Sequence, residues 1–265
     1  MKKKAVNISF NSLQEMSNWI EKTPRTERGE ASKASILETA SFKKFSGTKS
    51  FEEADNLMKY GDEENAKKIQ LASVNVKAKM TPGESNRNRL YNSPCGFLPV
   101  VPRVLAGVPE NMLNIRKENY KDTKVLNVMY NTSAGYNVEA SEIIDTAAKV
   151  ASAIRTLEKK GYRINLYLGD VCRVDGVPVS ISVKVKDSGQ YFDALRVAYP
   201  LVNPSFLRRH VFAILERIKD IRLTQDYGGV LSDEDAQNYL GAGAKYLSFY
   251  KCRHMNAEDI LKDFA

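Results

Sequence analysis

Residues 123–168 constrain the fold more than any other stretch, because they read as strand, polar loop, helix and strand. Residues 125–129 are almost continuously apolar, which is typical of a strand buried on both faces. Gly161 predicts the end of the helix, and alternate apolar residues over 164–168 predict the second strand. A right-handed crossover would make the two strands parallel neighbours. The helix shows apolar residues at intervals of three and four, namely Ile143, Ala147, Val150, Ala151, Ile154 and Leu157.

The sequence after this βαβ unit predicts an antiparallel hairpin and then more helices. Asp175-Gly176 is a turn sequence, and residues 179–186 alternate between apolar and polar, as in a strand with one face in water. Further helices are predicted over 191–199 and after the capping residues Asn203, Ser232 and Asn256, with a last strand over 246–250. The expected fold class is α/β, with a mixed, mainly parallel sheet flanked by helices.

The first part of the chain predicts mostly helices after a short strand over residues 5–10. Ser12 with Glu15, and Ser50 with Glu53, have the spacing of a capping box. Prolines and glycines interrupt residues 81–110, so no long regular element is expected there. The apolar run 96–102 predicts a buried strap over the core, with Cys95 as an inert packed thiol. We therefore expect residues 1–120 to form a helical and extended part that wraps the core, and residues 121–265 to form the α/β part.

A candidate ligand site follows from the expected parallel strands, because ligands of open α/β sheets lie beyond the carboxyl ends of the strands. Asn131, Thr132 and Ser133 follow the first strand, and Asp170 and Arg173 follow the second. If the strands are neighbours, these two loops meet. The alternative is purely structural: the first group caps the helix, and Asp170 is a turn residue.

The charge of the chain permits a second kind of site. There are 40 Lys and Arg against 32 Asp and Glu, which gives a formal net charge of +8 and a pI near 9.2. Lys184 and Lys186 on the expected wet strand face, with Arg208 and Arg209 on an expected exposed helix face, are candidate nucleic-acid contacts. The alternative is ordinary surface charge, because bases and acids are interspersed along most of the chain.

Several classes of chemistry lack their sequence signals. The three cysteines and two histidines are too few and too scattered to predict a disulfide framework, a zinc site or a catalytic triad. The sequence has neither GxGxxG nor GxxxxGK[ST]. No cofactor and no metal are expected. The absence of an apolar signal segment and of a membrane span predicts a cytoplasmic protein with no membrane partner.

The order of predicted elements in the second half resembles the von Willebrand factor A-like arrangement. In that family the first strand ends in Asp-x-Ser-x-Ser, whose side chains bind a divalent cation. The matching positions here are Asn131, Ser133 and Gly135, so the acidic residue and one hydroxyl are missing. The resemblance therefore implies the fold without an intact metal-binding motif.

A second resemblance lies in the amino-acid sequence of particular segments. GTKSFEEADNLMKYGD, VLNVMYN and LEKKGYRINLYL are similar to segments of uncharacterised bacteriophage-encoded proteins. This implies a phage protein that works in the cytoplasm of the infected host or is packaged in a particle. We expect a non-enzymatic protein that binds a host or phage protein or assembles with itself as a homo-oligomer. The alternatives are a basic nucleic-acid-binding protein of phage replication or packaging, and an enzyme that uses the strand-end crevice.

Overall fold

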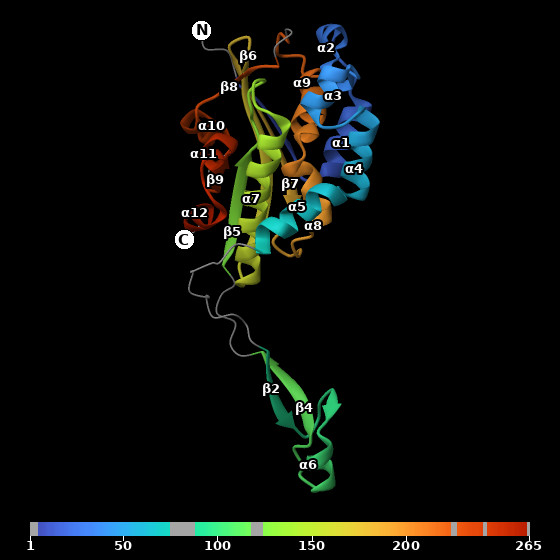
Figure 1. The fold of residues 1–265 in the computed structure, drawn as a ribbon, viewed down its shortest axis with the longest axis vertical. Coiled ribbons are helices and arrows are strands. Elements are labelled where there is room, and N and C mark those ends of the chain that lie inside the picture. The colour runs from blue at the N-terminus through green and yellow to red at the C-terminus, as the bar shows by residue number, and fades with distance from the viewer. Residues whose placement is uncertain (1–4, 75–87, 118–123, 224–226, 241–242, 264–265) are drawn as a thin grey trace.

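The computed structural model describes residues 5–74, 88–117, 124–223, 227–240 and 243–263. A six-stranded sheet forms its centre (Figure 1), with the strand order β1-β7-β6-β5-β9 and with β8 paired to β6. Parallel pairs join β1 to β7, β5 to β6 and β5 to β9, whereas β6 is antiparallel to β7 and β8. The predicted mixed sheet of an α/β fold is confirmed. Its strands are β1 (Val6–Phe10), β5 (Val125–Asn131), β6 (Arg163–Val174), β7 (Val177–Lys186), β8 (Gly229–Val230) and β9 (Lys245–Ser248).

The predicted βαβ unit is the middle of this sheet. β5 and β6 are parallel neighbours, and α7 (Ala140–Lys159) links them. The helix buries its apolar stripe, including Ile154 and Leu157, against the sheet face that carries Leu166 and Leu168. Burial of one such side chain contributes about 1.5–3 kcal/mol, so this layer is a main source of stability.

The hairpin from β6 to β7 turns at Asp175 and Gly176, which both have positive φ angles. That geometry matches the primed two-residue turns that suit the twist of paired strands. The predicted wet face of β7 is only partly correct. Lys184 is half-buried, but Lys186 is fully buried, because the pairing register shifts between Leu166 and Tyr167. The irregularity places Lys186 opposite Leu166, on the covered face of the sheet.

The first third of the chain packs on the same core as the βαβ unit. β1 extends the sheet beside β7, and α5 packs against α7 and α8. Ser12, Thr26, Thr39 and Ser50 each cap a helix through the side-chain oxygen, so both predicted capping boxes start helices. These helices are α1 (Leu13–Lys22), α2 (Glu27–Ser32), α3 (Ala40–Ser46), α4 (Phe51–Tyr60) and α5 (Glu63–Val74), with a 3₁₀ turn at Ala34–Ile36.

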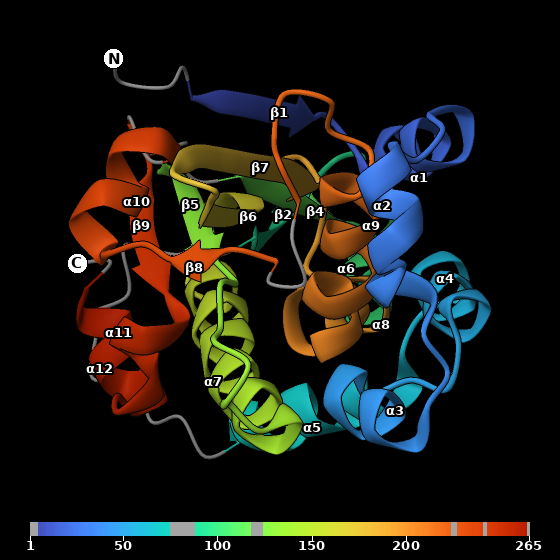
Figure 2. The same ribbon diagram turned by 90° about the horizontal axis from the view of Figure 1, so that it is seen from above.

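The C-terminal helices divide into two groups. Figure 2 shows α10, α11 and α12 gathered beside β9, on the side of the molecule opposite α1 and α4. The predicted strand over 246–250 is β9 only as far as Ser248, after which α11 begins. The helices of this part are α8 (Ala194–Val202), a π-helix (Phe206–Val211), α9 (Phe212–Leu215), α10 (Asp233–Leu240), α11 (Phe249–Arg253) and α12 (Ala257–Lys262).

Residues 88–117 form a second, small sheet, which Figure 1 shows apart from the main sheet and its helices. β4 is the middle strand, and β2 and β3 are both antiparallel to it. The predicted buried strap is wrong, because Phe97 and Leu98 are exposed, and Cys95 is exposed rather than packed. The unit consists of β2 (Asn88–Ser93), β3 (Leu98–Pro99), α6 (Val101–Leu105) and β4 (Met112–Lys117).

Candidate functional site

The two loops that the sequence places beyond β5 and β6 do meet. The Ser133 hydroxyl lies 2.6 Å from Oδ1 of Asp170 and 2.7 Å from Oδ1 of Asn131, and it accepts a hydrogen bond from the backbone N–H of Val171 at 3.0 Å. The Asn131 amide also donates to the Tyr246 hydroxyl at 2.9 Å. The juxtaposition predicted from the topology is therefore confirmed, and the polar groups form hydrogen bonds with one another.

This strand-end cluster lies inside the protein. Asn131, Ser133 and Asp170 are buried, and the side chain of Leu240 on α10 lies close over Gly169. Burial raises the pKa of the Asp170 carboxyl above its ordinary value, and the hydrogen bond from Ser133 offsets only part of that effect. Burial also raises the pKa of the Cys172 thiol well above its ordinary value. The arrangement suits a polar network that locks two loops together.

The remaining residues of the predicted crevice behave differently. Thr132 hydrogen-bonds Gly169 through its N–H and its hydroxyl, and Arg173 is exposed rather than part of the buried cluster. Asn131 and Ser133 occupy the positions of the A-domain metal motif, but their oxygens are engaged in the cluster. Among the described residues, no three His, Cys, Asp or Glu side chains lie close enough to hold a metal ion.

Arg208 and Arg209 do not form an exposed basic face, so that prediction is wrong. Both side chains are fully buried in the π-helix, where backbone carbonyls replace carboxylate partners. Arg208 donates to the carbonyls of Phe45 and Val138 at 2.6 and 2.7 Å, and its guanidinium lies 3.7 Å from the centre of the Phe45 ring. Arg209 donates to the Thr48 hydroxyl and carbonyl. The two arginines fasten the N-terminal segments to the π-helix.

Lys186 is also unavailable as a surface cation. Its ammonium group lies 2.5 Å from Oε1 of Glu158 on α7 and 3.0 Å from the carbonyl of Ile164. Lys184, the other lysine predicted on this strand, is accessible and pairs with Asp187. Of the four predicted nucleic-acid contacts, only Lys184 is on an accessible surface.

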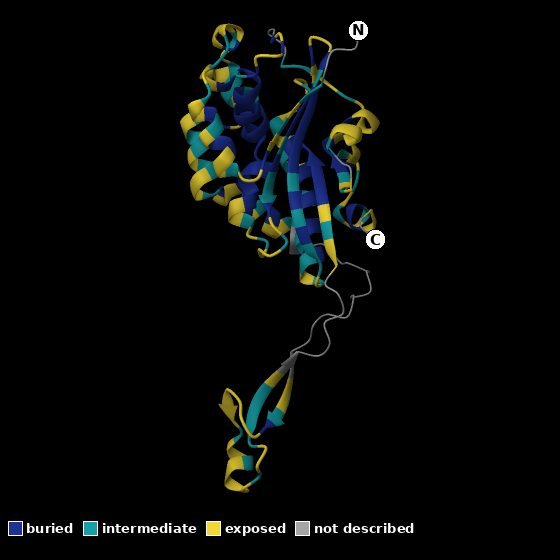
Figure 3. Cartoon of the chain, turned by 180° about the vertical axis from the view of Figure 1, so that it is seen from behind, coloured by how far each residue is buried: buried dark blue, intermediate teal, exposed yellow. Residues whose placement is uncertain are grey.

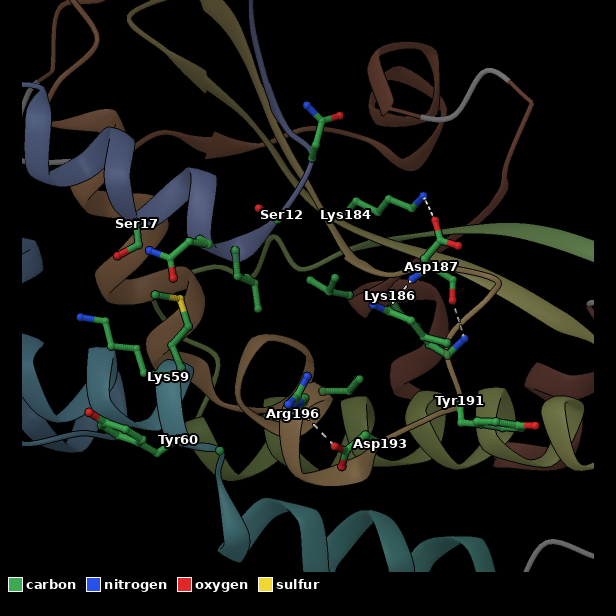
Figure 4. A pocket seen from close by; sticks show the side chains of 18 residues that line it. Ser12, Ser17, Lys59, Tyr60, Lys184, Lys186, Asp187, Tyr191, Asp193 and Arg196 are labelled. Atoms are coloured by element: carbon green, nitrogen blue, oxygen red, sulfur yellow. Dashed lines mark hydrogen bonds and ion pairs between the residues drawn. The ribbon is translucent and has the colours of Figure 1, made fainter.

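Lys184 belongs to a groove at the ends of β1 and β7 (Figure 4). The groove has a volume of about 980 Å³ and is lined by α1, the end of α4, the end of β7 and the start of α8. We call it the basic groove, and its accessible cations are Lys59, Lys184 and Arg196. Two strongly exposed tyrosines, Tyr60 and Tyr191, also line it.

Each cation of the basic groove has an acidic neighbour. Lys59 pairs with Asp55 at 2.6 Å and Arg196 with Asp193 at 3.6 Å, while Lys184 pairs with Asp187. The hydrogen bond that Lys59 donates to the Asp55 carboxylate raises the pKa of Lys59, and the one that Lys184 donates to Asp187 raises the pKa of Lys184. Both lysines therefore remain charged throughout the neutral pH range, so the groove keeps these two positive charges for an anionic ligand.

The small sheet carries a third candidate site. Leu90 pairs with Ile115, and Leu98 pairs with Leu113. Directly opposite residues share a face of a sheet, so these four side chains lie on one face, which we call the apolar face. Leu90, Leu98 and Ile115 are 56%, 51% and 43% exposed, although side chains of this kind are normally buried. Figure 3 shows the small sheet mostly in the intermediate and exposed colours, whereas the strands of the main sheet are mostly buried.

The sequence contains weak signals for these two sites. Leu113 and Ile115 alternate with Asn114, which is a strand pattern, but the neighbouring prolines and glycines obscured it. Tyr60 is the last residue of α4 and Tyr191 lies before α8, and no local sequence pattern shows that these segments meet. The basic groove arises only when α1, α4, β7 and α8 come together.

Comparison with known proteins yields one family. Residues 1–264 match the model of a domain of unknown function, DUF7192. No curated protein and no solved structure matches the chain. Within the described residues, no helix is both long enough and apolar enough to cross a membrane.

Proposed function

We propose that this chain, which belongs to the DUF7192 family, is a non-enzymatic interaction protein. Its small sheet binds an extended segment of a partner protein. The partner adds a strand to β2 and covers the apolar face. The sequence resemblance to bacteriophage-encoded proteins would place this partner, of host or phage origin, in the cytoplasm of an infected cell.

The exposure of the apolar face carries this proposal. A sheet of three short strands cannot bury a core of its own, and apolar side chains grouped on an exposed surface are typical of a protein interface. α6 adds Val101, Val104 and Leu105 to the exposed apolar surface of the same unit. A partner that covered Leu90, Leu98 and Ile115 would remove most of this apolar area from water, which supplies the binding free energy.

The edge of β2 favours a polypeptide over a lipid surface. In the strand order β2-β4-β3, β2 is an outer strand, and within residues 88–117 it pairs only with β4. Its outward N–H and C=O groups can form a ladder with another extended chain. A lipid bilayer offers no such ladder, and backbone groups that enter it without partners are costly.

The charge of the unit favours an acidic partner over a second copy of the chain. Residues 88–117 contain Arg89, Arg103, Arg116 and Lys117 against one acid, Glu110. Two copies would bring like charges together, whereas acidic residues beside apolar ones in the partner would complement them. The expected ligand is an extended segment in which apolar and acidic residues alternate.

A selection from a random peptide library against the full chain tests this proposal. The expected result is enrichment of peptides with alternating apolar and acidic residues, and a loss of their binding of at least about tenfold in Leu90→Ser/Ile115→Ser. The matched control is Leu71→Ser, which removes an exposed leucine from α5. Enrichment without such a pattern, or equal binding to both variants, would refute the proposal. Light scattering that shows a dimer in the natural chain and none in the double variant would instead assign the face to a second copy.

A further inference from the structure

We infer that the basic groove binds single-stranded nucleic acid. This inference concerns the main sheet and does not depend on the small sheet or on its partner. It rests on three features of the groove: its cations, its exposed tyrosines and the segments that bring them together (Figure 4).

The cations of the basic groove are free to change partners. Lys59, Lys184 and Arg196 are paired with carboxylates that are themselves partly exposed. Exposed ion pairs of this kind contribute little stability, because water solvates both charges well. A phosphate that enters the groove can pair with these cations alongside their carboxylates, and release of its counterions drives binding.

The tyrosines supply surfaces for bases. Tyr60 is 78% exposed and Tyr191 is 81% exposed, and both line the groove from opposite segments, the end of α4 and the loop before α8. Aromatic rings in such positions stack on unpaired bases, whatever the base sequence. The guanidinium of Arg163 lies 5.1 Å from the centre of the Tyr191 ring, which holds the ring beside the groove.

The shape of the site favours a single strand over a duplex or an acidic peptide. Bases can reach Tyr60 and Tyr191 only when they are not paired inside a double helix. An acidic peptide would pair with the cations, but its carboxylates would not stack on the two exposed tyrosine rings. The volume of about 980 Å³ is at the upper end of the range of about 300–1,000 Å³ for ligand pockets, which leaves room for a strand.

The buried pair beneath the groove fixes its floor. Lys186 is held by Glu158 and by the carbonyls of Ile164 and Asp187, so the chain after β7 has a defined path. That path carries Asp187 and the N–H of Gly189, which hydrogen-bond each other, and it ends at Tyr191. Lys186 is thus a positioning residue and does not itself touch the ligand.

Fluorescence anisotropy with a labelled oligothymidylate of about twelve nucleotides tests the inference on the full chain. Tyr60→Ala and Tyr191→Ala are each expected to weaken binding at least about fivefold, because each removes one stacking surface. The matched control is Tyr136→Ala, which removes an exposed tyrosine outside the groove.

The same titration at several salt concentrations tests the cations. Lys184→Gln and Arg196→Gln are each expected to weaken binding, and to make the logarithm of the binding constant fall less steeply with the logarithm of the salt concentration. The slope should change by about 0.7 for each phosphate that the variant no longer neutralises. Lys262→Gln, on α12, is the matched control and is expected to keep both the affinity and the slope.

Four results would overturn the inference. They are an absence of binding at about 50 mM salt, equal losses in Tyr136→Ala and Tyr191→Ala, equal losses in Lys262→Gln and Lys184→Gln, and displacement of the oligonucleotide by an acidic peptide at equal concentration. Leu90→Ser/Ile115→Ser is expected to leave oligonucleotide binding unchanged. A failed peptide selection would therefore count against the small-sheet proposal alone, and absent oligonucleotide binding would count against the groove alone.

Discussion

Leu90 of β2 and Ile115 of β4 lie directly opposite each other on one face of the small sheet, and both are largely exposed. Leu166 of β6, in contrast, has the same kind of side chain at a position that is completely buried. Substitution is therefore expected to have little effect on the stability of the fold at Leu90 and Ile115, and a large effect at Leu166. The difference separates residues that stabilise the fold from residues that serve a partner.

Leu90→Ser/Ile115→Ser is expected to change the free energy of unfolding of the main sheet by no more than about 0.5 kcal/mol, because neither side chain packs in its core. Leu166→Ala is expected to lower it by about 2–5 kcal/mol, because apolar burial is reduced and a cavity remains. Urea denaturation followed by circular dichroism measures both. A loss above about 2 kcal/mol in the double variant would mean that the apolar face serves the fold rather than a partner.

Lys186→Ala is expected to lower the free energy of unfolding by about 3 kcal/mol, because it leaves the carboxylate of Glu158 partly buried without its cation. Lys186→Met combined with Glu158→Leu removes both charges and is expected to be more stable than Lys186→Ala. Denaturant titrations of the two variants make the comparison. If the double variant were the less stable one, the unpaired carboxylate of Glu158 would not be the cause of the loss in Lys186→Ala.

His210 is expected to make the fold sensitive to mild acid. Burial lowers the pKa of His210, an effect that Asp55 offsets in part and Arg209 reinforces, while the Tyr199 hydroxyl lies 2.7 Å from Nδ1. The unfolded chain binds the proton more readily, so this stability is present above the ordinary histidine pKa, near 6.5, and is lost as the pH falls below it. Thermal unfolding from pH 7.5 to pH 5 should show a shallower pH dependence in His210→Gln than in the natural chain. Parallel curves would exclude a neutral buried His210.

For Asp170, stability is expected to depend on pH in the opposite direction. Burial raises its pKa, so the folded chain holds the proton more readily than the unfolded one. The stability it contributes is present below the ordinary aspartate pKa, near 3.9, and is lost as the pH rises through the raised value. Asp170→Asn keeps an acceptor for Ser133 and removes the ionisation. In thermal unfolding, the variant is expected to gain stability relative to the natural chain as the pH rises from 4 to 7, and a constant difference across that range would contradict the assignment.

The sequence predicts the middle of the fold well because its signals there are local. The apolar run before Asn131, the helical spacing up to Leu157 and the alternation over β7 each report on a single element. The juxtaposition of Ser133 and Asp170 then follows from the parallel pairing of β5 and β6.

The errors arise where distant segments decide the environment. A shift in register, invisible in the alternating sequence, turns Lys186 towards α7. Arg208 and Arg209 read as surface charges, yet carbonyls of Phe45 and Thr48, more than a hundred positions earlier in the chain, satisfy them inside the protein. The basic groove has the same origin, because four separate elements build it. Residue types alone do not show which distant segments pack together.

Binding of an extended partner segment by the small sheet is tested most directly by a heteronuclear NMR titration of the full, isotope-labelled chain with a peptide of alternating apolar and acidic residues. The shifted signals are expected to belong to the amides of β2, from Asn88 to Ser93, and to the methyl groups of Leu90, Leu98 and Ile115, and the β2 amides are expected to become protected from exchange. Shifts confined to the main sheet, or none at a saturating peptide concentration, would contradict it.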